Sequence, residues 1–386
     1  MGSATDLGLE GSDRALAHRL HREVLIYRTR LDRALAGYCS RPLCDLDPPV
    51  LAALRVGAVQ LLILRTPAHA AVSATVGAME GHSASGLVNA VLRRLARSGE
   101  PSMDGEPDHV RFSHPRDLVE RWTTAFGRDR TIRLMEWNNS PPVIGGCFPG
   151  GVEDLEPGLY LSDYRRLHRT GADPMAALPP GVYLQDEATV LAARAAAKMA
   201  GGGRVLEIGA APGGKTVHLD PAASLVVSLD PSADRMHRWG ENAARMGLDR
   251  SVPLAALGQA LPFPGGMFDL VFVDAPCTNT GVYRRRPGAR WRWSRDLLKT
   301  CTGLQAGLLE SAAGAVAPGG VLFYSTCSLE SEENEERVSS FEEAFSGFSR
   351  VRPPVPDALV MNDLVSIFPP EHGIDGIFAA AWRRGS

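Results

Sequence analysis

Two cysteines stand directly after short apolar segments in the second half of the chain. Cys277 lies in Asp274-Ala-Pro-Cys, which follows LVFV, and Cys327 ends the segment GGVLFYSTC. A single buried cysteine is usually just a small hydrophobic residue. Two cysteines that each follow a predicted strand are a different case, because parallel strands place their carboxyl ends at the edge of the sheet where ligands bind. The spacing therefore predicts two thiols at one site.

A thiolate beside a carboxyl group suits chemistry on a pyrimidine ring. Carbon 5 of cytosine is too weak a nucleophile to attack a methyl sulfonium directly, whereas addition of a thiolate to carbon 6 makes carbon 5 reactive. Asp274 is placed to stabilise such an adduct near ring nitrogen 3. A second group must then help to release the product. These residues predict one cysteine as nucleophile and the other as helper, and they leave open which is which.

The glycine-rich segment EIGAAPGGKT (207–216) runs from a predicted strand into a predicted helix. Glycines let a backbone approach a ligand closely and leave the helix N-terminus open to it. Gly209 to Thr216 also fits G-x-x-x-x-G-K-[ST], the P-loop of NTPases, for which LVFVDAP could supply the magnesium-binding acid. Asp230 ends the next strand, where a ribose diol would bind. We therefore favour an adenosine-type cofactor and keep a P-loop-type NTPase as the alternative.

The segments that carry these residues alternate in character from about residue 181 onward. RVLEIG, LVVSLD, LVFVDAP and GGVLFYSTC are predicted strands, and LAARAAAKMA, ADRMHRWGENAARMG and LQAGLLESAAGAV are predicted helices between them. This order is typical of a parallel sheet with helices on both faces, the Rossmann-like α/β class. The predicted catalytic domain spans residues 181–386.

The first hundred residues favour helices instead. VLAALRVGAVQLLILR has apolar residues three and four apart, and GLVNAVLRRLARSG places Leu87, Val91, Leu92 and Leu95 on one stripe, away from its arginines. Residues 101–180 contain proline and glycine clusters, notably NNSPPVIGGCFPGG and DPMAALPPG, and are predicted to be a connecting subdomain.

Composition is that of an ordinary globular protein with two or three domains: 386 residues, 44% hydrophobic, 22% charged and a net charge of -3. No segment reaches the roughly 20 apolar residues of a membrane helix, and the start of the chain lacks the pattern of a signal peptide, so we expect no membrane and a cytoplasmic location. The six cysteines lack paired metal-ligand spacings, which predicts free thiols and no metal site.

AAPGGKT, DAPCTNTGVYRRRP and STCSLESEEN occur in this order and resemble the motifs of RNA 5-methylcytosine methyltransferases of the Nol1/Nop2/Sun type. The resemblance implies a class I methyltransferase fold, S-adenosyl-L-methionine as cofactor and RNA as substrate. It implies that Cys327 is the nucleophile and that Cys277 promotes release, with Asp274 and Lys215 as further catalytic residues. The implied cofactor-binding residues are Gly209, Ala210, Ala211, Pro212, Gly213, Gly214, Lys215, Asp230 and Asp274.

The first part of the chain carries a second resemblance. LRVGAVQLLILRTPAHAAV and GLVNAVLRRLARSG resemble the NusB-like helical domain of bacterial small-subunit ribosomal RNA (cytosine-5) methyltransferases, and SHPRDLVERWTTAFG resembles the segment that follows it there. The likeness extends from about residue 12 to 384. It implies an RNA-binding NusB-like domain over residues 1–100. This domain begins later than usual, as if its first helix were absent. The resemblance also implies that the protein is a monomer and that its partner is ribosomal RNA.

Two positions depart from the family pattern. Gly209 stands where the family usually has cysteine, and ALGQALPF offers only Leu257, Gly258 or Gln259 where the family has an acidic residue near the adenine. The second departure leaves a further alternative, a catalytically weakened RNA-binding or ribosome assembly factor. The presence of Cys277, Asp274, Lys215 and Cys327 argues against it.

YRRRPGARWRW, just after Cys277, contains five arginines and two tryptophans within eleven residues. Arginine contacts phosphates and aromatic rings stack on splayed bases, so Arg284, Arg285, Arg286 and Arg290 are predicted RNA contacts. Trp291 and Trp293 are equally well read as core residues. The target base would have to be unstacked to reach a thiol, which predicts a loop or an opened helix as substrate.

Overall fold

The computed structural model describes residues 9, 11–148, 155–167 and 181–386. The chain divides into two compact units, Met1–Ser140 and Pro141–Ser386. This division falls inside the predicted connecting segment 101–180, of which most of DPMAALPPG lies outside the described residues. The three-part division of the chain stays a prediction.

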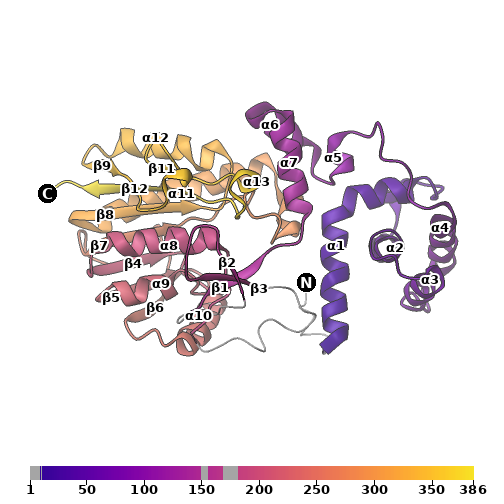
Figure 1. The fold of residues 1–386 in the computed structure, drawn as a ribbon, viewed down its shortest axis with the longest axis horizontal. Helices are drawn as coiled ribbons and strands as arrows, with labels where there is room; N and C mark the ends of the chain where they lie inside the picture. Colours follow the sequence, from indigo (N-terminus) through magenta and orange to yellow (C-terminus); the bar gives the residue numbers. More distant parts are fainter. Residues whose placement is uncertain (1–8, 10, 149–154, 168–180) are drawn as a thin grey trace. The chain divides into compact units, whose positions relative to one another are not determined.

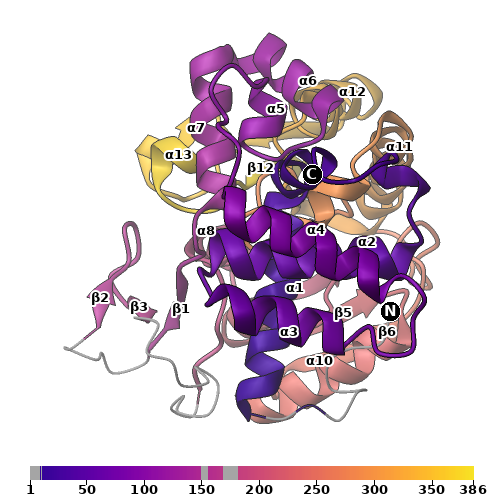
Figure 2. The ribbon, with the colours of Figure 1, turned by 90° about the vertical axis from the view of Figure 1, so that its right-hand side faces the viewer.

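Helices build the first unit (Figures 1 and 2). They are α1 (Gly11–Ala36), α2 (Pro48–Ala58), α3 (Ala68–Gly77), α4 (Ser85–Ser98), α5 (Asp108–Arg111), α6 (Arg116–Phe126) and α7 (Arg128–Asn139), with a 3-10 turn at Leu43–Asp45 and a π-helical turn at Val59–Ile63. Helix α2 begins with two prolines, whose missing N–H groups cost nothing in a first turn.

The apolar stripe of α4 forms the centre of this unit. Val91, Leu92 and Leu95 are buried, Leu87 packs at the edge of the same cluster, and the arginines of the helix are exposed. Helix α2 passes close to α4 at Gly57, where an added Cβ would lie 2.4 Å from Leu92 Cδ1. The prediction of amphipathic helices here is confirmed.

A nine-stranded sheet forms the second unit, with strand order β10-β11-β12-β8-β7-β4-β5-β6 and β9 paired to β12. The strands are β4 (Arg204–Ile208), β5 (Leu225–Asp230), β6 (Ser251–Ala255), β7 (Phe268–Asp274), β8 (Val316–Thr326), β9 (Phe348–Val351), β10 (Val360–Met361), β11 (Leu364–Ser366) and β12 (Phe378–Arg384). The strands from β6 to β8 pair in parallel, and β12 joins β8 antiparallel. The predicted Rossmann-like fold is confirmed.

Helices cover both faces of this sheet (Figure 1). They are α8 (Glu187–Met199), α9 (Thr216–Leu219), α10 (Ala233–Met246), α11 (Arg295–Ala315), α12 (Glu335–Ala344) and α13 (Pro369–His372). Alternate strand residues point to opposite faces. Val205, Leu270 and Phe272 therefore share a core with α8, whereas Leu206 and Val271 share one with α11 and α12.

The strand order reverses beside β4. The chain moves outward from β4 through β5 to β6 and then returns to the other side of β4 with β7. Such a switch point leaves a crevice at the carboxyl ends of the two strands, where ligands bind in open α/β sheets. The glycine-rich loop follows β4, and the Asp274-to-Cys277 segment follows β7, so both lie at this point.

A small antiparallel sheet, β1 (Ile144–Cys147), β3 (Tyr164–Leu167) and β2 (Glu156–Pro157), precedes α8 in the second unit (Figure 2). No helix in the described ranges is both long and apolar enough to cross a membrane.

Candidate active site

The glycine-rich loop lies against the end of β7. Gly209 has φ +84°, and a Cβ there would lie 2.4 Å from the carbonyl oxygen of Asp274. Gly213 has φ +103° and passes the ring of Trp239. Only glycine adopts these conformations without strain. The loop is therefore a cradle lined by backbone atoms, and a side chain at either glycine position would fill its space.

Lys215, the last residue of the loop, turns towards β7. Its Nζ lies 2.5 Å from Asp274 Oδ2. Burial would lower the pKa of Lys215, but the carboxylate of Asp274 outweighs that effect and the pKa is raised. The ammonium group thus keeps its charge, and the pair presents a carboxylate and an ammonium at the switch point.

The hydroxyl of Thr216 points into the protein interior. It is buried, donates to Glu207 Oε2 at 2.6 Å and accepts from Trp239 Nε1 at 3.0 Å. A P-loop requires this hydroxyl on magnesium and the preceding lysine on phosphate. Here both side chains are engaged inside the protein, so the arrangement does not fit the P-loop alternative.

Asp230 ends β5 as a buried carboxylate. Its Oδ1 accepts from the Ser232 backbone N–H at 3.0 Å, and within the described part of the chain its Oδ2 has no hydrogen bond. Arg235 Nη1 lies 3.0 Å from that oxygen but outside hydrogen-bonding geometry. A buried unsatisfied acceptor at this strand end fits a ribose hydroxyl. Together with the glycine cradle, it fits an adenosine-type cofactor.

The two thiols lie side by side at the ends of neighbouring strands. Cys277 Sγ and Cys327 Sγ are 3.2 Å apart. Backbone hydrogen bonds hold the two loops together, from the Ala275 N–H to the Ser325 carbonyl and from the Gly281 N–H to the Cys327 carbonyl, both at 2.9 Å. The hydrogen bond with Cys327, and then burial, raise the pKa of Cys277 well above its usual value. Cys277 is therefore poorly suited to act as a thiolate.

Sequence reasoning missed Glu333, a buried carboxylate that ties the two cysteine loops together. Its donors are the backbone N–H and hydroxyl of Thr278, the hydroxyl of Ser328 and the side-chain amide of Gln305. Burial raises the pKa of Glu333, and these donors oppose the shift. The only sign in the sequence was its place in STCSLESEEN, which looks like an exposed acidic run.

Asn279 is a second residue that sequence reasoning missed. It lies two residues after Cys277 with φ +61°, in the left-handed region that asparagine tolerates better than most residues. Its amide reaches both cysteines: Nδ2 donates to the Cys277 carbonyl at 2.7 Å, and Oδ1 lies 3.3 Å from Cys327 Sγ. Its preference for turns was the only available signal.

The segment after β6, which the family resemblance places near the adenine and which we call the adenine end, is built differently. After β6, Leu257 is 61% exposed, and Gln259 is exposed as well. Gly258 between them is buried, since an added Cβ would lie 2.5 Å from Leu308 Cδ2 and 2.7 Å from Ile208 Cγ2. The segment thus passes over the end of β4 without a carboxylate.

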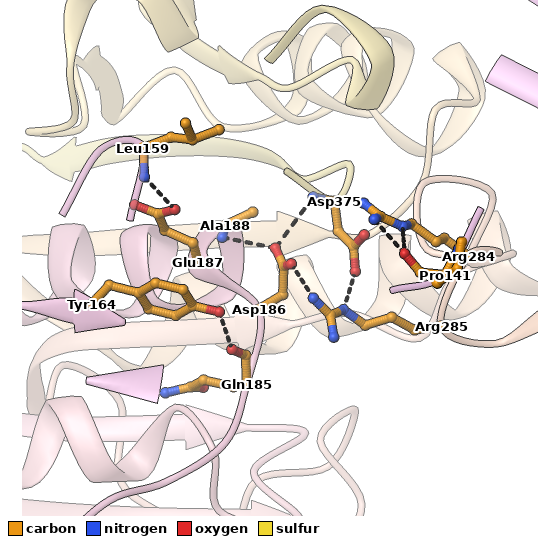
Figure 3. Close-up of polar contacts among 10 residues, drawn as sticks. All are labelled: Pro141, Leu159, Tyr164, Gln185, Asp186, Glu187, Ala188, Arg284, Arg285 and Asp375. Atoms are coloured by element: carbon orange, nitrogen blue, oxygen red, sulfur yellow. Dashed lines mark hydrogen bonds and ion pairs between the residues drawn. The ribbon is translucent and has the colours of Figure 1, made fainter. Parts of the chain in front are cut away.

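The arginine run needs a correction. The structure engages Arg284 and Arg285, expected to contact RNA, inside the second unit (Figure 3). Arg284 is buried, and its Nε donates to the Pro141 carbonyl at 2.8 Å. Arg285 lies between two carboxylates, with Nη2 2.5 Å from Asp186 Oδ2 and Nε 2.5 Å from Asp375 Oδ2. A backbone carbonyl thus holds the guanidinium group of Arg284, and two buried carboxylates far away in the sequence hold that of Arg285.

The remaining residues of the run differ in how far they are buried. Arg290 is fully buried with its guanidinium 5.9 Å from the Tyr283 ring centroid, and Trp293 is buried too. Neither is placed to contact RNA, and for Trp293 the core reading is the correct one. Trp291 is partly buried. Arg286 is exposed and lies 3.4 Å from Asn279 Oδ1, beside the thiols. As an RNA contact, Arg286 stays a prediction.

Metal ligands are not gathered at this site. The described residues hold no group of three or more histidine, cysteine, aspartate or glutamate side chains that could bind a metal ion. The described part of the chain contains only free cysteines.

Solved structures share this fold. The protein PH0851 has a TM-score of 0.83 at 22% identity, over 97% of this chain and 91% of that chain. NSun6 from Pyrococcus horikoshii, solved with SFG, has a TM-score of 0.59 at 20% identity, over 70% of this chain and 98% of that chain. At these identities the likeness shows the fold alone.

Sequence comparisons give the family. The family described as 16S rRNA methyltransferase RsmB/F matches residues 195–383, and the NusB family matches residues 3–97. Ribosomal RNA small subunit methyltransferase B of Xanthomonas campestris is 35% identical over 85% of this chain and 79% of its own length, and that of Pseudomonas putida is 34% identical over 85% and 81%. This relationship overturns the NTPase alternative. The chain belongs to the 16S rRNA methyltransferase RsmB/F family and is a methyltransferase that uses S-adenosylmethionine.

Proposed function

We propose that the chain methylates carbon 5 of a cytosine in small-subunit ribosomal RNA through a covalent adduct between Cys327 and carbon 6. The observation that carries this proposal is the thiol pair, 3.2 Å apart, beside the Lys215–Asp274 ion pair at the carboxyl ends of β7 and β8. Neither a direct methyl transfer nor a binding protein needs two thiols there. The names of the relatives support small-subunit ribosomal RNA as the substrate.

The residues divide the chemistry between them. The Cys327 sulfur, as thiolate, forms a bond to carbon 6, and the ring electrons move towards carbon 5, which becomes the nucleophile. Asp274 would lie against the ring at nitrogen 3, where the Lys215–Asp274 pair would supply the proton that neutralises the adduct. Bound S-adenosylmethionine supplies the electrophilic methyl group. A base then takes the carbon 5 proton, the carbon–sulfur bond breaks and Cys327 leaves with the electron pair as the thiolate. Cys277 assists this release.

The backbone cradle of the glycine-rich loop indicates which residues would bind the cofactor. Residues 209–215 would surround the cofactor with backbone, and Asp230 would accept from the ribose through its unsatisfied Oδ2. Glu207 lies beneath the loop and positions it through Thr216. Cofactor contacts by Ala210, Ala211, Pro212 and Gly214 stay predictions.

Two single variants test the division of roles. Cys327→Ala should abolish methyl transfer, and Cys277→Ala should accumulate a protein–RNA adduct, visible as a retarded band on a denaturing gel. An adduct with Cys327→Ala would reverse the two roles, and undiminished methylation by that variant would refute the covalent route. Bisulfite sequencing of ribosomal RNA from cells with and without the gene would identify the cytosine.

A further inference from the structure

Asn279 has an amide orientation fixed by its neighbours. Its Nδ2 donates to the Cys277 carbonyl at 2.7 Å, and a carbonyl can only accept. Its Oδ1 accepts from Arg286 Nη1 at 3.4 Å, and a guanidinium can only donate. The amide cannot be turned over without losing both contacts. Oδ1 is therefore the atom that faces the Cys327 sulfur at 3.3 Å.

This orientation distinguishes the two forms of the nucleophile. A protonated Cys327 thiol can donate to Oδ1, whereas a thiolate is only an acceptor and would face another acceptor. The contact therefore favours the protonated thiol and fixes the direction of its S–H bond. We propose that Asn279 is a positioning residue, which holds the Cys327 thiol protonated and aimed beside Cys277 until the base arrives. The proposal rests on Cys327 being the nucleophile.

Other groups also act on Cys327. Cys277 lies in the same loop as Asn279, Lys215 comes from the glycine-rich loop, and Cys301 comes from α11. Lys215 is charged and favours the thiolate, and a protonated Cys277, 3.2 Å away, can donate to the Cys327 sulfur and favours it as well. Asn279 thus opposes both Lys215 and Cys277. Approach of the base, by displacing the Asn279 contact, would leave these two groups as the stronger influence.

Asn279→Gly and Asn279→Asp test this from opposite directions. Glycine removes the acceptor and adopts a φ of +61° more readily than asparagine does, so the backbone is not strained. Aspartate puts a negative charge beside the sulfur. The measurement is the rate at which iodoacetamide alkylates Cys327, followed by peptide mass spectrometry from pH 6 to 10. This reaction reports the thiolate fraction without RNA or cofactor.

We expect the midpoint of the alkylation profile to move to lower pH in Asn279→Gly and to higher pH in Asn279→Asp, each by about half to one pH unit. Asn279→Asp should then methylate RNA roughly three- to tenfold more slowly at pH 7, in proportion to its thiolate. Asn362→Gly is the matched control, because Asn362 also has positive φ (+52°) but is an exposed residue of the β10–β11 turn.

Three results would overturn the proposal. The profile could stay unchanged in both Asn279 variants, both could shift in the same direction, or Asn362→Gly could shift it equally. If aspartate prevents folding, as judged by thermal unfolding, the glycine variant alone still decides. Because alkylation needs no methyl transfer, its outcome is independent of the Cys327→Ala result that tests the proposed function.

Discussion

The two ends of the candidate site are built differently. At the thiol end, Glu333 and Asn279 connect the loops after β7 and β8 through buried or half-buried hydrogen bonds. At the adenine end, the chain after β6 presents an exposed Leu257 on a backbone packed closely over Ile208. Covalent chemistry requires atoms held to within a fraction of an ångström, whereas an aromatic ring is bound mainly by apolar surface. The contrast agrees with the proposed function, in which bonds form and break only at the thiol end.

The strongest test of the thiol end is the ion pair beside it. Asp274→Asn should lower kcat by about 100-fold or more, the scale of a lost acid–base group, because the amide no longer pairs with Lys215. Single-turnover methyl transfer is the measurement. Asp269→Asn is the matched control, at the start of the same strand, where Asp269 accepts from the Arg204 N–H. Equal losses in both variants would mean that the strand, rather than the site, was damaged.

Substitutions of Glu333 test whether the rigidity of the thiol end depends on this one carboxylate. Glu333→Ala leaves buried donors without an acceptor and should lower the free energy of unfolding by about 2–4 kcal/mol. Glu333→Gln keeps one acceptor oxygen and should lose less. Urea denaturation measures both, with Glu343→Ala on the exposed side of α12 as control. A loss below 0.5 kcal/mol, at roughly the level of surface substitutions, would show that the two loops do not depend on Glu333.

Glu207 lies beneath the glycine-rich loop and predicts a pH dependence. Burial raises its pKa from 4.5 to about 7, although Thr216 and Ser228 donate to it. Between these values the folded state binds more protons than the unfolded state, so stability falls as pH rises from 4.5 to 7. Burial and the neighbouring Asp186 outweigh the effect of Arg285 and raise the pKa of Asp375 to about 7 as well, so Asp375 contributes to the same fall.

Glu207→Gln should therefore reduce this fall in the free energy of unfolding by about 1–3 kcal/mol. The measurement is urea denaturation at several pH values, with the exposed Glu310→Gln as control. A decline equally steep in Glu207→Gln and the wild type would contradict the assignment.

We expect the smallest effect from a substitution at the adenine end. Leu257→Glu supplies a carboxylate that can accept from an adenine amino group, which should tighten S-adenosylmethionine binding by about threefold, the worth of one partly exposed hydrogen bond. Calorimetry gives the Kd. Met361→Glu is the control, since Met361 is 60% exposed but lies in β10, at the far edge of the sheet. Weaker binding in Leu257→Glu would show that the exposed leucine itself contacts the cofactor.

The residues that sequence analysis placed together are those at strand ends. Cys277, Cys327 and the glycine-rich loop follow β-branched segments, and the geometry of a parallel sheet brings such ends to one edge. Glu333 and Asn279 follow no such rule. Their roles depend on which backbone donors face them after the loops fold, and nothing in their immediate sequence records that.

The arginine run shows the opposite error. Three adjacent arginines and a fourth nearby look like a solvated, phosphate-binding surface. Asp186 and Asp375, which hold Arg285, stand 99 and 90 residues away in the sequence, so no local pattern reveals them. Buried charge pairing is a tertiary property. The exposed Arg286 could not be told apart from its buried neighbours by residue type.

The distance in sequence between Arg285 and Asp375 also means that the two residues leave the ribosome at different times during synthesis. Translation proceeds at about 5–20 residues per second, so Asp375 leaves the ribosome roughly 5–18 seconds after Arg285. Until then, Arg285 can pair with Asp186 but not with Asp375. The carbonyl of Gly281, in the loop that carries Cys277, also lacks its hydrogen bond from the Gly376 N–H. The loop that carries Cys277 therefore lacks part of its support until the end of the chain has left the ribosome, and we expect ribosome-arrested chains that expose β12 to transfer methyl groups faster than chains arrested before it emerges.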